Sequence, residues 1–421
     1  MYSHEDSRLP ERSLLAQFFA RAAGWSERLG LLDGPFDAED LIAAACRQTG
    51  LSSFGPSWSR DALQHLLNAC REEAKLNALG RLALRQDIVR MLVNRLEIER
   101  DHATHPEITE AAVERPIFIV GLPRTGTTLL HNLLAQDPAN RTPLTWEVMF
   151  PSPLSQASEA RRTRRAQRNL DWLERLAPRF RAVHAVGAEL PQECVAITSH
   201  AFLSDQFDTM FRVPSYQAWL ELQDLSPAYA WHRRFLQHLQ HRRSADRWVL
   251  KAPAHLWSLD ALLAEYPDAT IVQTHREPAE VLGSLASLTA QLRGVFSDHV
   301  DPGAIGSELA AYWARALDRA AKVRATRGPI SFHDIPYSQL CEDPLRVIHS
   351  LYRLLDLPFS AEAESRMESF LKAHPREQHG RHRYELADFG LDATQEAARF
   401  SDYRAQFAPS LTPPCQTAPA A

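Results

Sequence analysis

The sequence predicts an α/β protein in which a doubly wound parallel sheet is flanked by helices on both sides. Four short runs predict the strands, at residues 116–120, 247–251, 269–275 and 329–335. The first run, PIFIV, is continuously apolar and β-branched, which is typical of a parallel strand buried on both faces. Each run is followed by a polar turn and a helical pattern, as expected of repeated strand–helix units.

Helical patterns around these strands predict the domain organisation. Residues 1–112 are expected to form an N-terminal helical region, in which Asp37 caps a helix that stops at Gly50. We expect the core over residues 113–392, with a helical insertion at about 150–240, and a C-terminal helix and frayed tail over 393–421. The N-terminal region carries no catalytic signature, so we expect it to cover the core or to support a homodimer.

Composition narrows the class of protein. The chain has 421 residues, of which 45% are hydrophobic and 24% charged, an ordinary globular composition. Its net charge of -5 gives no indication of a nucleic acid or an anionic membrane as partner. No apolar run approaches the ~20 residues of a membrane helix, and the polar N-terminus is unlike a signal peptide. We therefore expect no transmembrane segment. The cysteines are few, odd in number and without a C-x-x-C pair, which favours free thiols in a reducing compartment, so we expect a cytoplasmic protein.

The stretch RPIFIVGLPRTGTTLLHNLL has the order strand, glycine loop and helix of a P-loop-like phosphate site. Gly121 and Gly126 keep the spacing of G-x-x-x-x-G-K-[ST], but Thr127 stands where that motif has lysine. The nearest cation is Arg124, within the loop. Hydroxyls of Thr125, Thr127 and Thr128 are additional donors, and a tight turn without a ligand is the alternative.

Two further cations follow predicted strand ends, at the edge where open α/β sheets bind ligands. Arg276 lies just past the third run, and Ser284 lies eight residues later on the following helix. Together they suit a second phosphate group, although a structural ion pair explains Arg276 as well. Lys251 ends the second run, in a chain whose only other lysines are Lys75, Lys322 and Lys372. The choice of lysine indicates that a compact hydrogen-bond donor is needed at the end of this strand; the alternative is that Lys251 is an ordinary surface lysine.

The motifs GLPRTGTT, LKAPAHL and THREPAEVLGSL, in this order, resemble the PAPS-dependent sulfotransferases, in which PAPS is 3′-phosphoadenosine 5′-phosphosulfate. The resemblance covers residues 113–392 and is strongest to the bacterial branch near the tyrosylprotein sulfotransferases. It implies transfer of a sulfuryl group from PAPS to a hydroxyl acceptor by in-line displacement. A sulfuryl group carries less charge than a phosphoryl group, so the resemblance implies that no metal is needed.

The resemblance also implies roles for single residues. Arg124 stands by motif position beside the bridging oxygen of the donor, within a loop whose other donor-binding residues are Thr125, Gly126, Thr127 and Thr128. Arg276 and Ser284 match the pair that holds the 3′-phosphate. Lys251 is expected to stabilise charge on the bridging oxygen as the sulfuryl group leaves. Tyr337 matches a tyrosine near the adenine. The segment QHGRHRYELADFGL resembles a late nucleotide-contacting segment, where His382 and Tyr384 are the candidates.

A hydroxyl acceptor needs a general base, and Glu147 in LTWEVMFPSP is the candidate. It lies 23 residues after Arg124, close to the spacing of the catalytic glutamate in the tyrosylprotein relatives. Apolar neighbours are expected to raise its pKa by desolvation, although the surrounding residues match those relatives poorly. Glu193, His200 and His131 are the rivals, and a structural salt bridge is the alternative role.

The insertion is rich in aromatic residues, which indicate an acceptor pocket, a lid or an ordinary helical core. Its arginine run at 161–168 indicates a solvated helix face or a site for an anionic acceptor. The acceptor itself, small or lipid-like, is not fixed by the sequence. A P-loop kinase is disfavoured by Thr127 and by the lack of an aspartate-ended strand that would hold magnesium. A non-catalytic module that binds PAP (3′-phosphoadenosine 5′-phosphate, the product left when PAPS loses its sulfuryl group) or another nucleotide is the further alternative.

Overall fold

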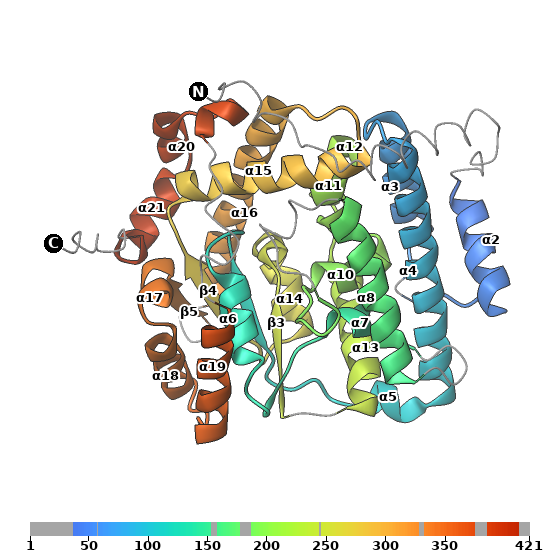
Figure 1. Cartoon of the computed structure of the whole chain (residues 1–421), viewed down its shortest axis with the longest axis horizontal. Helices are drawn as coiled ribbons and strands as arrows, with labels where there is room; N and C mark the ends of the chain where they lie inside the picture. Colours follow the sequence, from blue (N-terminus) through green and yellow to red (C-terminus); the bar gives the residue numbers. More distant parts are fainter. Residues whose placement is uncertain are drawn as a thin grey trace. The chain divides into compact units, whose positions relative to one another are not determined.

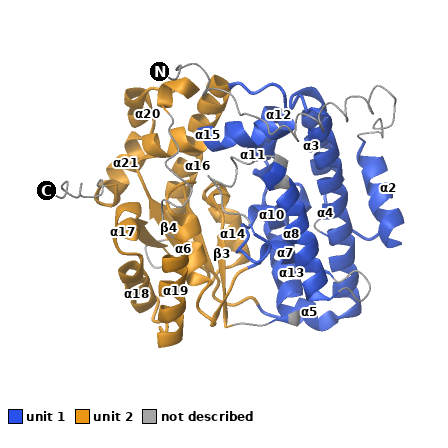
Figure 2. Cartoon of the chain, in the orientation of Figure 1, with its two compact units in different colours: residues 1–112, 143–244, 287–301 blue, residues 113–142, 245–286, 302–421 orange. Residues whose placement is uncertain are grey.

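The computed structural model describes residues 37–56, 58–152, 158–176, 187–243, 246–327, 332–374 and 385–411. The chain forms two compact units, each built from separate stretches of sequence (Figure 2). Unit 1 comprises residues 1–112, 143–244 and 287–301, and unit 2 comprises residues 113–142, 245–286 and 302–421. No helix among the described residues combines the length and the apolar character that crossing a membrane would require.

Unit 2 contains a five-stranded sheet whose paired strands all run parallel, in the order β2-β3-β1-β4-β5. Strands β3, β4 and β5 of this sheet are labelled in Figure 1. The strands are β1 (Ile117–Gly121), β2 (Asn140–Arg141), β3 (Arg247–Lys251), β4 (Thr270–His275) and β5 (Phe332–Pro336). The predicted parallel sheet is confirmed. The first three residues of the run at 329–335 lie outside the described residues. Strand β2 was not predicted, because two polar residues carry no strand pattern.

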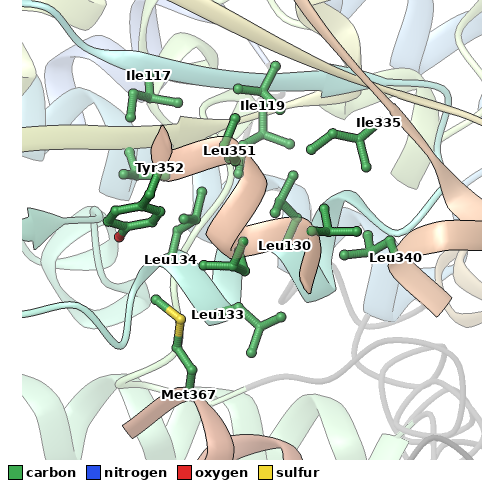
Figure 3. Packing of buried hydrophobic residues seen from close by; sticks show 14 of the residues in the cluster. Ile117, Ile119, Leu130, Leu133, Leu134, Ile335, Leu340, Leu351, Tyr352 and Met367 are labelled. Carbon is green, nitrogen blue, oxygen red and sulfur yellow. The ribbon is translucent and has the colours of Figure 1, made fainter. Parts of the chain in front are cut away.

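Helices cover both faces of the sheet, as its alternating side chains require. Ile117 and Ile119 point to one face, where they share a core with leucines of α6 and with Met367 (Figure 3). Phe118 points to the other face, where its ring meets His255 and Tyr266. The helical segments of unit 2 are α6 (Thr127–Leu134), η2 (Pro253–Trp257), α14 (Leu259–Glu265), α16 (Pro302–Arg327), α17 (Tyr337–Glu342), α18 (Pro344–Leu354), α19 (Ala361–Ala373), η4 (Leu386–Phe389), α20 (Ala393–Arg399), α21 (Ser401–Phe407) and η5 (Ala408–Ser410).

The part of unit 1 that the structure describes is helical. Its segments are α2 (Ala38–Thr49), α3 (Arg60–Glu72), α4 (Ala78–Thr104), α5 (Pro106–Glu110), α7 (Thr145–Met149), α8 (Glu159–Leu176), α10 (Val195–Thr198), η1 (Ser199–Ala201), α11 (Gln206–Met210), α12 (Pro214–Leu220) and α13 (Ser226–Arg242). Helix α15 (Pro278–Phe296) begins in unit 2 and ends in unit 1. The predicted caps of α2 are confirmed, since Asp37 accepts from Glu39 N and Gly50 adopts a φ of 72°.

Aromatic residues of the insertion fill the core of unit 1. Phe202, Trp231 and Phe235 are fully buried, and Phe207 and Tyr216 almost so. Phe207 stacks on Phe202 with ring centres 6.1 Å apart and meets the Tyr216 ring edge to face at 6.0 Å. The helical-core interpretation therefore accounts for these residues, and a part in an acceptor pocket stays a prediction.

Candidate functional site

The predicted donor residues of unit 2 gather at the carboxyl ends of β1, β3 and β4. The connection that leaves β1 leads to β2, at one edge of the sheet, whereas the connection that leaves β4 leads to β5, at the other. Strands β1 and β4 are neighbours, so the direction of the chain crossings reverses between them. Open α/β sheets bind ligands at such a switch point, outside the carboxyl ends of the strands.

Two glycines shape the loop that joins β1 to α6. Gly121 has a φ of 138°, and a Cβ there would meet Thr274 Oγ1 at 2.5 Å. Gly126 has a φ of 87°, and a Cβ there would lie 2.8 Å from Leu340 Cδ2. Both positions therefore need glycine for conformation and for space. The resulting turn places the N-terminus of α6, with its backbone N–H groups and positive dipole end, directly after β1.

The three threonines of the loop have different surroundings. Thr125 is fully buried, and its hydroxyl donates to Leu122 O at 2.6 Å and lies 2.6 Å from Thr274 Oγ1. The expectation that this hydroxyl faces a ligand is therefore corrected: it holds the loop against β4. Thr127 is buried at the first position of α6, and Thr128 is half-buried.

Arg124 and Arg276 come together with their predicted neighbours. Arg124 is exposed, with a φ of 66°, and its Nε donates to Ser284 Oγ at 3.1 Å. Arg276 Nη1 donates to Arg124 O at 3.1 Å, and its guanidinium lies 4.5 Å from the centre of the Tyr337 ring. Arg276 also pairs with Glu280 at 3.1 Å, which is the ion pair that the sequence left open. The Glu280 side chain is 57% exposed, and such pairs contribute only ~0–1 kcal/mol, so a phosphate can displace it.

Lys251 is buried at the end of β3, with 2% of the residue exposed, which excludes the surface-lysine alternative. Its Nζ donates to Thr128 Oγ1 at 3.3 Å, so the lysine lies against the same loop as Arg124. His131, on α6, is also buried and donates from Nε2 to Val249 O at 3.2 Å. Burial, and then the charge of Lys251, lower the pKa of His131 to about 3, so this imidazole is neutral. The loop is thus flanked by three cations, two exposed or half-buried and one buried.

Glu147 lies on α7 of unit 1 and is buried, with 5% of the residue exposed. One carboxylate oxygen, Oε2, accepts from Leu144 N at 3.0 Å and so caps the first turn of α7. This gives the residue a structural role, and its function as general base stays a prediction. Of the rivals, His200 and His131 are enclosed, and burial lowers the pKa of each to about 3, which makes both weak bases. Glu193 is half-buried.

Of the remaining candidates for the nucleotide site, one lies among the described residues and two do not. Tyr337 begins α17, beside Gly126 and under Arg276, as the resemblance implies for a residue near the nucleotide. His382 and Tyr384 lie outside the described residues. Among the described residues, the group that could hold a metal ion is His105, Glu107 and His241, which are exposed on unit 1 and belong to none of the motifs above.

A polar network around the buried His275 supports Arg276 and was not predicted. His275, fully buried, donates from Nε2 to Asp334 Oδ1 at 2.7 Å, and its Nδ1 accepts from the Tyr403 hydroxyl at 2.8 Å. Arg324 closes the other side of Asp334 with two hydrogen bonds of 2.9 Å. Burial would raise the pKa of Asp334, but the bonds from His275 and Arg324 outweigh it and lower the pKa to about 2.

This network ties α21 to the end of β4, directly before Arg276. The one sequence signal for it is the position of His275 next to Arg276. Its partners lie 59 and 128 positions further along the chain, too far apart for any local pattern to join them.

The chain is similar to known proteins in sequence and in fold. A profile of the sulfotransferase family matches residues 116–361. The chain is 29% identical over 260 residues to the omega-hydroxy-beta-dihydromenaquinone-9 sulfotransferase Stf3 of Mycobacterium bovis. That match covers 58% of this chain and 63% of the relative, so it spans less than two thirds of the relative's length.

Two solved structures are similar over most of the chain. Sulfotransferase STF1 from Mycobacterium tuberculosis H37Rv has a TM-score of 0.77 at 34% sequence identity, covering 86% of this chain and 98% of that one. Sulfotransferase STF9 from Mycobacterium avium has a TM-score of 0.79 at 29% identity, covering 91% of this chain and 99% of that one.

Proposed function

Since the chain belongs to the sulfotransferase family, we propose that it transfers a sulfuryl group from PAPS to a hydroxyl acceptor. The observation that carries the proposal is that Arg276, after β4, and Ser284, on α15, both contact Arg124 of the glycine loop at the switch point of the sheet. A loop of this kind binds a phosphate through backbone N–H groups and the helix dipole. PAPS offers two phosphate-like groups, the 5′-phosphosulfate and the 3′-phosphate, and the site offers two sets of donors.

The donor sets are assigned by their place in the fold. The 5′-phosphosulfate would lie on the N–H groups of residues 124–128, with the Thr128 hydroxyl and Lys251 at its side. The 3′-phosphate would replace Glu280 on the guanidinium of Arg276 and take a second bond from Ser284. Tyr337, with Arg276 over its ring, would form part of the nucleoside site. His382 and Tyr384 stay predictions from the resemblance.

The proposed chemistry is one in-line displacement. The acceptor oxygen bonds to the sulfur while the bond from sulfur to the bridging oxygen breaks, so the products are a sulfate ester and PAP. A general base, for which Glu147 is proposed, takes the proton of the acceptor hydroxyl. Negative charge grows on the bridging oxygen as it leaves, and Arg124 and Lys251 stabilise that charge. These cations take the part that a metal ion has in phosphoryl transfer, so we propose that none is needed.

The acceptor is proposed only as a class. The name of the Mycobacterium bovis relative describes action on a dihydromenaquinone, which is a lipid-like molecule. We therefore propose a small or lipid-like hydroxyl compound for this chain as well. A cytoplasmic location and a homodimer stay predictions.

Two alternatives are separable from this proposal. A kinase-like phosphotransferase is disfavoured because Thr127 stands where a nucleoside triphosphate needs lysine. A non-catalytic PAP-binding module would bind the nucleotide without turnover.

The test is an incubation of the full chain with PAPS labelled in the sulfuryl group and a pool of hydroxyl compounds that includes quinols, sterols and phenols. We expect label in an organic product and formation of PAP. If PAP binds tightly and no compound is labelled, the binding-module alternative replaces the enzyme. If label moves only when the donor is ATP labelled in its terminal phosphate, the kinase alternative replaces it.

A further inference from the structure

Helix α8 (Glu159–Leu176) carries a basic stripe that the donor site does not use. At 100° per residue, five arginines and one tryptophan fall within about one third of the helix circumference. They are Arg161, Arg164, Arg165, Arg168, Trp172 and Arg175, which are all exposed. Trp172 has 47% of its surface exposed, and the guanidinium of Arg175 lies 5.8 Å from the centre of its ring. We call these six residues the arginine stripe.

The opposite side of α8 holds the helix to unit 1. Ala166 and Leu170 are buried in a cluster with Trp146 and Phe150. Arg162, which lies off the stripe, donates from Nη1 to Phe150 O at 3.0 Å and covers the Trp146 ring at 4.8 Å. The apolar face of α8 is therefore already used in packing. The arginine stripe is therefore the solvent-exposed face of a helix whose apolar face is packed against unit 1.

The charges of the stripe are only partly balanced: among the described residues, the charge of Glu97 acts on Arg165. Of the acidic residues of the last two turns, Asp171 borders the stripe, about 20° from Arg164 on the helix circumference, and accepts from Gln167 Nε2 at 2.8 Å, whereas Glu174 lies further away. Within the described part of the chain, no recorded salt bridge involves any of the five arginines. Burial, and then the charge of Arg90, lower the pKa of Arg165. The charge of Glu97 raises that pKa, and the charge of Arg168 lowers it. A net charge of -5 for the whole chain thus conceals a concentrated positive surface.

We propose that the arginine stripe docks the protein on an anionic phospholipid surface. Arginine forks bind phosphate oxygens in pairs, and clusters of four to eight basic residues on a helix attract anionic lipid. An exposed tryptophan among them favours a membrane over nucleic acid or an acidic protein, since tryptophan concentrates where headgroups meet acyl chains. The choice of a membrane also rests on the proposed function, because a lipid-like acceptor would be found in a membrane. The existence of the arginine stripe does not depend on the proposed function.

The expected strength follows from the number of charges. Each basic residue near an anionic surface contributes about 1 kcal/mol, or about 5-fold in partition. Replacing Arg164 and Arg168 by glutamine should then lower vesicle binding by about 25-fold. Among the residues that the structure describes, neither side chain forms a hydrogen bond or an ion pair with unit 1, so the fold should be kept. A control with the same change of charge is Arg327→Gln with Arg353→Gln, two exposed arginines on α16 and α18.

The experiment is co-sedimentation of the full chain with vesicles of phosphatidylcholine alone or with about one third phosphatidylglycerol. We expect the wild-type chain to bind the anionic vesicles only, and to lose that binding when salt is raised well above 0.1 M. The Arg164/Arg168 variant should bind about 25-fold more weakly, whereas the affinity of the control should change less than about 2-fold. Trp172→Ala should weaken binding at unchanged charge. PAP affinity of each variant, measured by calorimetry, should equal that of wild type.

Three results would overturn the proposal. These are equal binding to both kinds of vesicle, an equal loss for the control variant, and tighter stripe-dependent binding to polyglutamate or single-stranded DNA than to vesicles. Since vesicle binding and PAP binding are read without turnover, a failure here is distinct from a failure of the proposed sulfuryl transfer.

Discussion

The role proposed for Lys251 makes a prediction that separates chemistry from stability. Lys251→Met keeps the length of the side chain and removes its charge. The lysine is 2% exposed, and its recorded hydrogen bond, to Thr128 Oγ1, is long at 3.3 Å. Loss of one such bond costs about 0.5–1.5 kcal/mol, and the relief from burying a charge offsets part of this. Loss of this bond should therefore change the free energy of unfolding by about 1 kcal/mol, well below the effect expected on turnover.

Turnover of the same variant should fall far more. A preorganised charge aimed at a developing oxyanion contributes roughly 10²–10³-fold in kcat, or about 2.7–4 kcal/mol. The assay is steady-state kinetics with an acceptor found by the labelled-donor screen, beside urea unfolding and PAP calorimetry. Lys322→Met, an exposed lysine on α16, is the matched control and should leave all three measurements unchanged. A Lys251→Met enzyme with kcat within about 3-fold of wild type, where chemistry limits the rate, would refute the reasoning.

Four other predictions follow from the same geometry. Glu147→Gln should lower kcat by roughly 10²-fold or more at unchanged PAP affinity, and a near-normal kcat would move the base to Glu193 or another group. Turnover should persist in EDTA, and its loss with recovery on adding magnesium would favour a kinase-like mechanism. Tyr403→Phe leaves the buried imidazole of His275 without its hydroxyl donor and should lower the free energy of unfolding by about 1–3 kcal/mol in urea titrations. The folded pKa of His131, about 3, lies below its unfolded value of about 6.5, so His131 binds a proton only when the chain unfolds. Its contribution to stability should therefore fall by up to about 1.4 kcal/mol per pH unit as pH drops from 6.5 towards 3, and a His131→Gln variant with the same pH dependence as wild type in urea titrations would contradict this.

The sheet and the phosphate loop were predictable because their signals are local. A parallel strand buried on both faces is continuously apolar, and β1 has that pattern. Gly121 and Gly126 were recognisable by their spacing, and the structure supplies the reason, since each has positive φ and no room for a Cβ. Arg276 and Lys251 follow strands whose carboxyl ends share one edge of a parallel sheet, so the topology alone brings them to the same loop.

Other parts depend on packing that no local pattern records. The hydroxyl of Thr125 turns inward because Thr274 of the neighbouring strand lies within hydrogen-bonding distance. The network around His275 needs residues from β5 and α21, which are adjacent only in the folded chain. The aromatic insertion had two equally good interpretations, because a buried core and an apolar pocket use the same residues.

The proposed donor site recognises a 3′-phosphate, which PAP carries and AMP lacks. Calorimetry of the wild-type chain with PAP and with AMP tests this directly. Arg276 and Ser284 should each contribute a charge-assisted hydrogen bond of about 1.5–3 kcal/mol, so PAP should bind at least about 10²-fold more tightly than AMP. Arg276→Ala should remove most of that difference, whereas Arg353→Ala, an exposed arginine on α18, should leave it intact. Equal affinity of the wild-type chain for PAP and AMP would contradict the account.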